Sequence, residues 1–210
     1  MQNLFNPDSK FMQFLSRLGD LMILNLLFLL TSLPLVTIGA GLAAMYTVCF
    51  RFDTDRERGV VSTYFAAFRE NFRQATVLWL ILALCIGTAC LNTAVFYVMT
   101  ASVHWFWPVF GFLAVLAVLI FSYTFPLLSQ FENSILGHLR NALALSIGYL
   151  PRSLIVAALN VLPFVLVMTD LYTFFQVGFI WFMLYFAAAA YLSSRVLKKV
   201  FAPYYEEESL

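Results

Sequence analysis

Four polar side chains interrupt long apolar stretches of this sequence, at Asp20, Asn25, Asn92 and Asn160. A polar group within the hydrocarbon of a membrane is costly unless it is paired, so such residues either join neighbouring helices or line a path for an ion or solute. We favour helix-joining roles for the three asparagines. Asp20 is expected at the start of a helix, where its carboxylate meets the positive end of the helix dipole and Arg17 lies close enough to neutralise it.

Enzymatic chemistry has no visible basis in the sequence. His104 and His138 are far apart and are expected on opposite sides of the membrane, which argues against a shared metal ion. Serines and threonines occur without a Gly-x-Ser-x-Gly elbow, and there is no Walker A loop. We therefore expect no catalytic residues, no cofactor and no metal. Three cysteines in apolar runs are interpreted as buried free thiols, at Cys49, Cys85 and Cys90.

The composition assigns these residues to a membrane. Hydrophobic residues make up 62% of the chain, charged residues only 11%, and the mean hydropathy is +0.87, whereas soluble domains carry about 25% charged residues. The net charge of +1 conceals charges gathered in a few short stretches, a pattern that argues against nucleic-acid binding. We expect one integral membrane domain over residues 1–210, in contact with the lipid bilayer.

The apolar runs predict an all-α bundle of about six transmembrane helices. The run from Leu18 to Phe50 exceeds the roughly 20 residues of one span, so we expect it to cross twice. Pro34 and the cluster Gly39–Gly41 supply the break, and Thr37 is expected to cap the second arm. Both arms are short and require a thinned bilayer or burial behind other helices. The further expected spans cover 75–99, 109–128, 153–168 and 172–192.

Two amphipathic helices are expected in the membrane interface. Phenylalanines at helical spacing beside arginines predict one in the segment 60–74, and a second is expected at 136–145 within the half-polar segment 132–150. Glu132 and Arg140 are eight residues apart, and we favour a solvated face over a functional pair for them. The candidate partner-contact residues in these segments are Phe65, Phe68, Arg69, Phe72, Arg73, Glu132 and Arg140.

The positive charges predict the orientation of the chain. With six crossings, every Lys and Arg falls on the side of the two termini, and the opposite turns near His104 and Asp170 contain none. Since Lys and Arg concentrate in cytoplasmic loops, the segment 1–17 and the acidic tail 200–210 are both expected in the cytoplasm. A five-span alternative, in which Leu18 to Phe50 crosses once, breaks this pattern.

Several local sequences resemble a known family. They are Asn6-Pro7-Asp8-Ser9, Arg17-Leu18-Gly19-Asp20, Leu33-Pro34-Leu35-Val36-Thr37-Ile38-Gly39-Ala40 and Phe68-Arg69-Glu70-Asn71-Phe72-Arg73-Gln74-Ala75-Thr76. They are similar to motifs of the YesL family, small bacterial integral membrane proteins with a domain of unknown function. The resemblance implies the bacterial cell membrane and, through gene neighbourhood, an association with carbohydrate ABC importers. It brings no site residues with it.

Two hypotheses follow from the sequence. The first is an accessory membrane subunit of a carbohydrate, or oligosaccharide, ABC import system, which stabilises or modulates the permease subunits. The alternative is a stand-alone transporter or channel for a small solute, with a path lined by Asp20, Asn25, Asn92 and Asn160. A membrane enzyme or a chaperone ranks last, because no convergent set of titratable groups is visible.

Overall fold

Helices form every regular element in residues 10–52, 59–98, 107–169, 172 and 178–207, which are the residues that the computed structural model describes. The all-α class predicted from the sequence is confirmed. In chain order the elements are α1 (Lys10–Thr31), the 3-10 turn η2 (Leu35–Thr37), α2 (Ile38–Arg51), α3 (Val60–Val98), α4 (Trp107–Leu128), α5 (Ile135–Gly148), α6 (Leu150–Thr169), α8 (Gly178–Ile180), the π-helical segment η3 (Trp181–Tyr185) and α9 (Phe186–Glu207).

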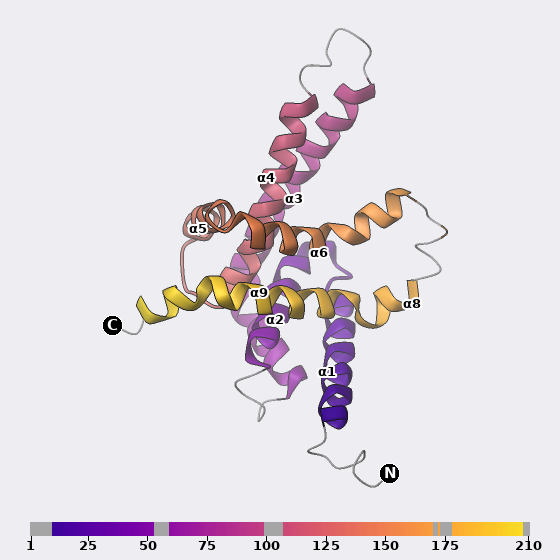
Figure 1. Cartoon of the computed structure of the whole chain (residues 1–210), viewed down its shortest axis with the longest axis vertical. Coiled ribbons are helices and arrows are strands. Elements are labelled where there is room, and N and C mark those ends of the chain that lie inside the picture. Colours follow the sequence, from indigo (N-terminus) through magenta and orange to yellow (C-terminus); the bar gives the residue numbers. More distant parts are fainter. Residues whose placement is uncertain (1–9, 53–58, 99–106, 170–171, 173–177, 208–210) are drawn as a thin grey trace.

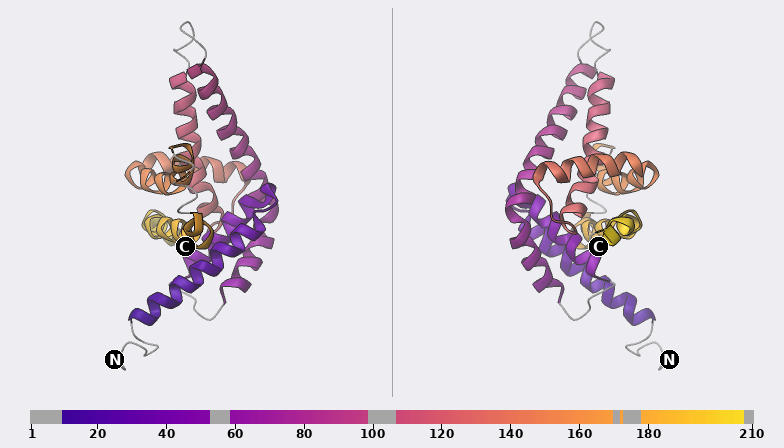
Figure 2. Two further views of the ribbon diagram at one scale, coloured as in Figure 1. Left: turned by 90° about the vertical axis from the view of Figure 1, so that its right-hand side faces the viewer. Right: turned by 90° about the vertical axis from the view of Figure 1, so that its left-hand side faces the viewer.

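Two antiparallel helix pairs frame the molecule (Figures 1 and 2). In the first pair, α3 and α4 lie side by side, with Phe96 stacked on Phe110 at 5.3 Å between ring centroids and Trp79 against Phe121 at 6.1 Å. In the second pair, α6 contacts α9, and the Tyr185 hydroxyl of η3, which leads into α9, donates to the Leu159 carbonyl of α6. Figure 2 shows that α6 and α9 run across the first pair, and α4 contacts α6 directly.

Helix α2 lies at the centre of the fold. From Gly39 to Phe50 all of its residues are buried except Leu42, and it contacts α1, α3, α4 and α9. At 14 residues it is about 21 Å long, shorter than the ~30 Å hydrocarbon core. Burial behind other helices is therefore how the short second arm is accommodated.

The glycine cluster serves close packing and not the helix break. Gly39 and Gly41 lie inside α2, and a methyl group on Gly39 would meet the Ala75 carbonyl oxygen and lie 2.5 Å from the Trp79 Cβ. The absence of a side chain there lets the backbones of α2 and α3 approach closely, as small residues do between membrane helices. Our assignment of Gly39–Gly41 to the break was wrong.

The break falls between Thr31 and Ile38, around Pro34 as predicted. Thr37 does not cap α2 with its side chain. Its hydroxyl instead donates back to the carbonyls of Thr31 and Pro34, which closes the turn. The hydroxyls of Thr31 and Tyr64 share a hydrogen bond of 2.6 Å, so the turn is also held to α3.

Four helical segments of the described chain are long and apolar enough to cross a membrane, which makes the chain a multi-pass membrane protein. They are Phe11–Thr31, Val60–Val98, Pro108–Leu128 and Gly178–Tyr205. Helices α5 and α6 supply a fifth crossing if the pair, bent by 112°, is one broken span. The structure thus supports four or five spans in the described chain, and the sixth predicted crossing falls on α2, which is too short to count among them.

Three boundaries differ from the sequence-based expectation. The segment 60–74 is not a separate interfacial helix but the first part of α3, because no proline or glycine separates it from the apolar span. Residues 200–207 continue α9 with Val200 and Phe201 buried, so they are no trailing tail. Residues 10–17 already belong to α1. Positions 1–9, 208–210, His104 and Asp170 lie outside the described residues.

The close contact at Gly39 predicts a specific sensitivity to a single methyl group. Gly39→Ala should destabilise the protein by about 1–3 kcal/mol, because the new Cβ overpacks the α2–α3 contact. Gly87→Ala is the matched control, since Gly87 also lies inside a helix but has open space at its Cβ, and it should be neutral or stabilising by up to about 1 kcal/mol. Thermal unfolding in a mild detergent measures both, and equal shifts would contradict the prediction.

Candidate functional site

Asn25 joins α1 to the helical segment that contains η3. Its side chain is fully buried, with 0% of its surface exposed. The amide nitrogen donates to the Phe182 carbonyl at 2.8 Å, and the amide oxygen accepts from the Ala187 backbone nitrogen at 3.0 Å. Those two backbone groups are five residues apart, the spacing of one π-helical hydrogen bond. The carboxamide of Asn25 therefore bridges the widened turn and satisfies both groups.

Neighbouring side chains fix this junction from two further helices. The Tyr185 hydroxyl donates to Leu159 of α6 at 2.6 Å, and the Phe186 ring lies 5.5 Å from that of Phe28 in α1. A side chain inserted into the backbone hydrogen-bond ladder is a known cause of a bend or break in a helix, and π-bulges are frequent at functional sites. We refer to Asn25, Phe182, Tyr185 and Ala187 as the π junction.

The structure separates the four polar residues singled out from the sequence. Asn25 lies in the π junction, whereas Asn160 of α6 donates to the Ser122 hydroxyl of α4 at 3.1 Å. Asn92 donates to Thr88 within its own helix α3 at 2.7 Å. Asp20 lies well inside α1, which begins at Lys10, so its expected place at a helix start was wrong. Two of the four thus bond to another helix, and the four do not converge on one site.

Arg17 has a role that sequence reasoning missed. Its guanidinium donates to the Phe52 carbonyl at 2.9 Å, at the C-terminal end of α2, and lies 4.3 Å above the Phe52 ring. A cation at this position complements the negative end of the helix dipole. Arg195 lies 5.1 Å from the Tyr191 ring, and Arg17 lies 5.9 Å from the same ring. No spacing in the sequence links Arg17 to Phe52, which is 35 residues away.

The predicted partner-contact residues of α3 divide between the core and the surface. Phe68 packs against the core and stacks on Tyr64 at 6.2 Å. Phe65 and Phe72 are 41% and 39% exposed. At about 100° per residue, four exposed side chains span an arc of roughly 100° on α3. We call these four the α3 strip: Phe65, Arg69, Phe72 and Arg73.

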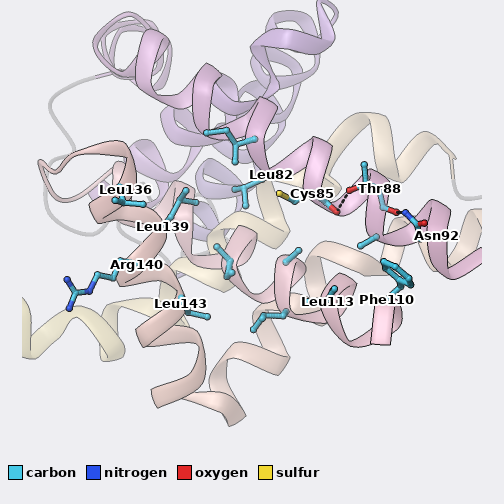
Figure 3. Close-up of a pocket in the computed structure, with 15 residues that line it drawn as sticks. Leu82, Cys85, Thr88, Asn92, Phe110, Leu113, Leu136, Leu139, Arg140 and Leu143 are labelled. Carbon is cyan, nitrogen blue, oxygen red and sulfur yellow. Dashed lines mark hydrogen bonds between the residues drawn. The ribbon is translucent and has the colours of Figure 1, made fainter. Parts of the chain in front are cut away.

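Glu132 and Arg140 line two different cavities and do not form a functional pair. Glu132 lines a cavity of about 450 Å³ together with Asn141 and Tyr204. His138 also lines it and is buried, and its Nε2 has no hydrogen-bond partner among the described residues. Arg140 instead lines a groove of about 710 Å³ between α3, α4 and α5 (Figure 3).

Cysteine placement differs in part from the expectation, and no metal cluster is found within the described ranges. Cys49 is buried in α2, whereas Cys85 and Cys90 are exposed on α3, and all three are free thiols. The expectation of burial was therefore wrong for two of them. Among the residues that the structure describes, no three His, Cys, Asp or Glu side chains come together as a metal site.

Comparison with known proteins identifies one related family. Residues 21–93 match the family described as "Protein of unknown function, DUF624". This segment is about a third of the chain and contains the second half of α1, all of α2 and most of α3. No curated protein and no solved structure matches the chain. The match supports a family with a domain of unknown function, over the segment that contains Asn25 and the α3 strip.

The π junction predicts that Asn25 and Asn92 respond differently to the same substitution. Asn25→Leu leaves the Phe182 carbonyl and the Ala187 N–H unpaired in a buried place, which should cost about 1–3 kcal/mol. Asn92→Leu removes only a bond within its own helix, and the effect should stay within about 0.5 kcal/mol. Thermal unfolding compares the two variants. Hydrogen exchange at the Ala187 amide should also accelerate in Asn25→Leu, and unchanged protection would refute the bridging role.

Proposed function

We propose that this chain is an accessory membrane subunit that docks against another membrane protein through the α3 strip. The observation that supports this is the position of two exposed phenylalanines and two arginines on one helix face. Aromatic and arginine side chains are enriched at protein interfaces, and they dominate binding energy where they are covered.

The continuity of α3 favours a protein partner over the membrane surface for this strip. The helix has 39 residues and is about 58 Å long, almost twice the ~30 Å hydrocarbon core. When the apolar part of α3 crosses the membrane, its first turns extend beyond the hydrocarbon as part of the same helix. We propose that the strip on these turns faces a neighbouring protein.

The partner we propose is a permease subunit of a carbohydrate ABC importer, which the chain would stabilise or modulate. This choice rests on the resemblance of the local motifs to the YesL family and on the gene neighbourhood that the resemblance implies. The same resemblance supports a place in the bacterial cytoplasmic membrane. Glu132 is exposed at the start of the α5 region and is the second candidate contact.

The competing function is a stand-alone small-solute transporter. The π junction favours it, because interrupted helices accompany transport sites near the membrane midplane. Two observations argue against it. The nitrogen and the oxygen of the Asn25 side chain both bond to backbone groups, and Asn92 and Asn160 do not lie in the π junction. Solute flux into vesicles containing the purified chain tests this alternative, and flux that is weakened by Asn160→Leu would support it.

Co-purification tests the accessory role. A tagged copy expressed at its native level and extracted in mild detergent should bring down sugar-importer permease subunits, identified by mass spectrometry. Phe65→Ala combined with Phe72→Ala should reduce their recovery at least about tenfold, since hot-spot aromatics contribute 2 kcal/mol or more. Phe112→Ala is the control, because Phe112 is exposed on α4 and away from the strip. Recovery of the lone chain, or equal losses in both variants, would refute the proposal.

Reporter fusions test the proposed orientation. Both termini are expected in the cytoplasm, because all 12 Lys and Arg then lie on that side. An even number of crossings keeps the termini together, whereas five crossings, with α5 and α6 as one broken span, would separate them. Reporters active only in the cytoplasm, fused to each end in turn, should both be active. Activity at one end alone would contradict the proposed orientation.

A further inference from the structure

The groove between α3, α4 and α5 offers an apolar surface that would face the hydrocarbon where α3 and α4 cross a membrane. Its lining is almost entirely apolar, with Leu82 of α3, Leu113 of α4 and Leu139 of α5 among the contributors (Figure 3). The helices α3 and α4 are both long and apolar enough to span. Leu113 of α4 is 45% exposed, and Leu136 of α5 is 75% exposed. An occupant of this groove must therefore be apolar along most of its length.

A single cation marks one end of the groove. Among the described lining residues Arg140 is the one charged side chain, and it is exposed. In Figure 3 its guanidinium extends away from Leu139 and Leu143, out of the apolar lining. The far end is formed by Asn92 and Phe110. The groove thus has a charged mouth and an apolar interior.

The length of the groove fits one leaflet of a bilayer. Along α3 its lining runs from Ile81 to Asn92, which is about 17 Å at 1.5 Å per residue. Half of the ~30 Å hydrocarbon core is about 15 Å. The groove is therefore about as long as one leaflet is thick, a length that suits an acyl chain whose headgroup lies beside Arg140.

We propose that this groove binds one phospholipid with an anionic headgroup, whose phosphate lies at Arg140 and whose acyl chain lies along the apolar lining. A guanidinium forms paired hydrogen bonds with phosphate oxygens, which an ammonium cannot match in geometry. Basic residues beside membrane helices attract anionic lipids over zwitterionic ones. The groove has a volume of about 710 Å³, which is enough for an acyl chain. A free phosphate ion would leave most of this volume empty. Arg140 is thereby assigned to lipid and not to the permease partner, and this assignment does not depend on the proposed function.

Lipid retention by the purified full chain tests the site. The protein is exposed in detergent to equal amounts of phosphatidylglycerol and phosphatidylcholine, and the bound lipid is counted by native mass spectrometry. The wild type should retain phosphatidylglycerol several-fold better. Arg140→Gln should abolish this preference while phosphatidylcholine binding is unchanged. Arg51→Gln is the matched control, because Arg51 is also exposed but does not line the groove, and it should leave the preference intact.

Two cysteines of α3 supply a measurement that needs no substitution in the groove. Cys85 lines the groove and Cys90 does not, although both thiols are free and exposed. Phosphatidylglycerol should slow alkylation of Cys85 by a membrane-permeant maleimide several-fold and leave Cys90 unaffected. Excess inorganic phosphate should not reproduce this protection, which separates the lipid from a free ion. Equal retention of both lipids by the wild type, or equal protection of both thiols, would overturn the proposal.

Discussion

A buried carboxamide joins α1 to the η3–α9 segment of this chain. Asn25 lies near the start of the chain and its two hydrogen-bond partners lie near the end, 157 and 162 residues away. Water is scarce at such a place, so an unpaired backbone group in η3 would be expensive. The widened turn and the amide depend on each other. The amide of Asn25 pairs the Phe182 carbonyl and the Ala187 N–H, and these two backbone groups in turn pair the buried amide. The packing of α1 against η3 and α9 follows from this exchange.

Close contact is the second constraint on the fold. Hydrocarbon offers little hydrophobic drive for helices to associate, so they adhere through shape and through hydrogen bonds. The buried helix α2 meets this requirement with Gly39 and Gly41 toward α3 and α1, and with alanines along its length. Trp79 adds a hydrogen bond to the Leu35 carbonyl at 2.8 Å, which fixes the turn before α2 against α3. The matched segment 21–93 covers α2 and these contacts.

Apolar runs, charge clusters and Pro34 were sufficient to predict helices, a membrane and the main break, because these features act locally. Long-range partners were not predictable in the same way. The amide of Asn25 signals that a partner exists but not that it is the backbone at 182 and 187. Thr37 stands where a capping residue would, yet its hydroxyl bonds backward to the turn. The polarity of 60–74 suggested a separate surface helix, but in the absence of a helix breaker α3 continued through it.

The uninterrupted length of α3 has a mechanical consequence. An unbroken helix of 39 residues transmits movement along its length, so that its two ends can move in opposite directions about the point where it is held. That point lies near Ala75 and Trp79, where the helix is clamped against α2 and η2. When the bilayer thins or thickens, the apolar arm of α3 tilts to keep its residues in hydrocarbon. The opposite arm, with Phe65 and Phe72, would then move with it, and a partner docked there as proposed would respond to the thickness of the membrane.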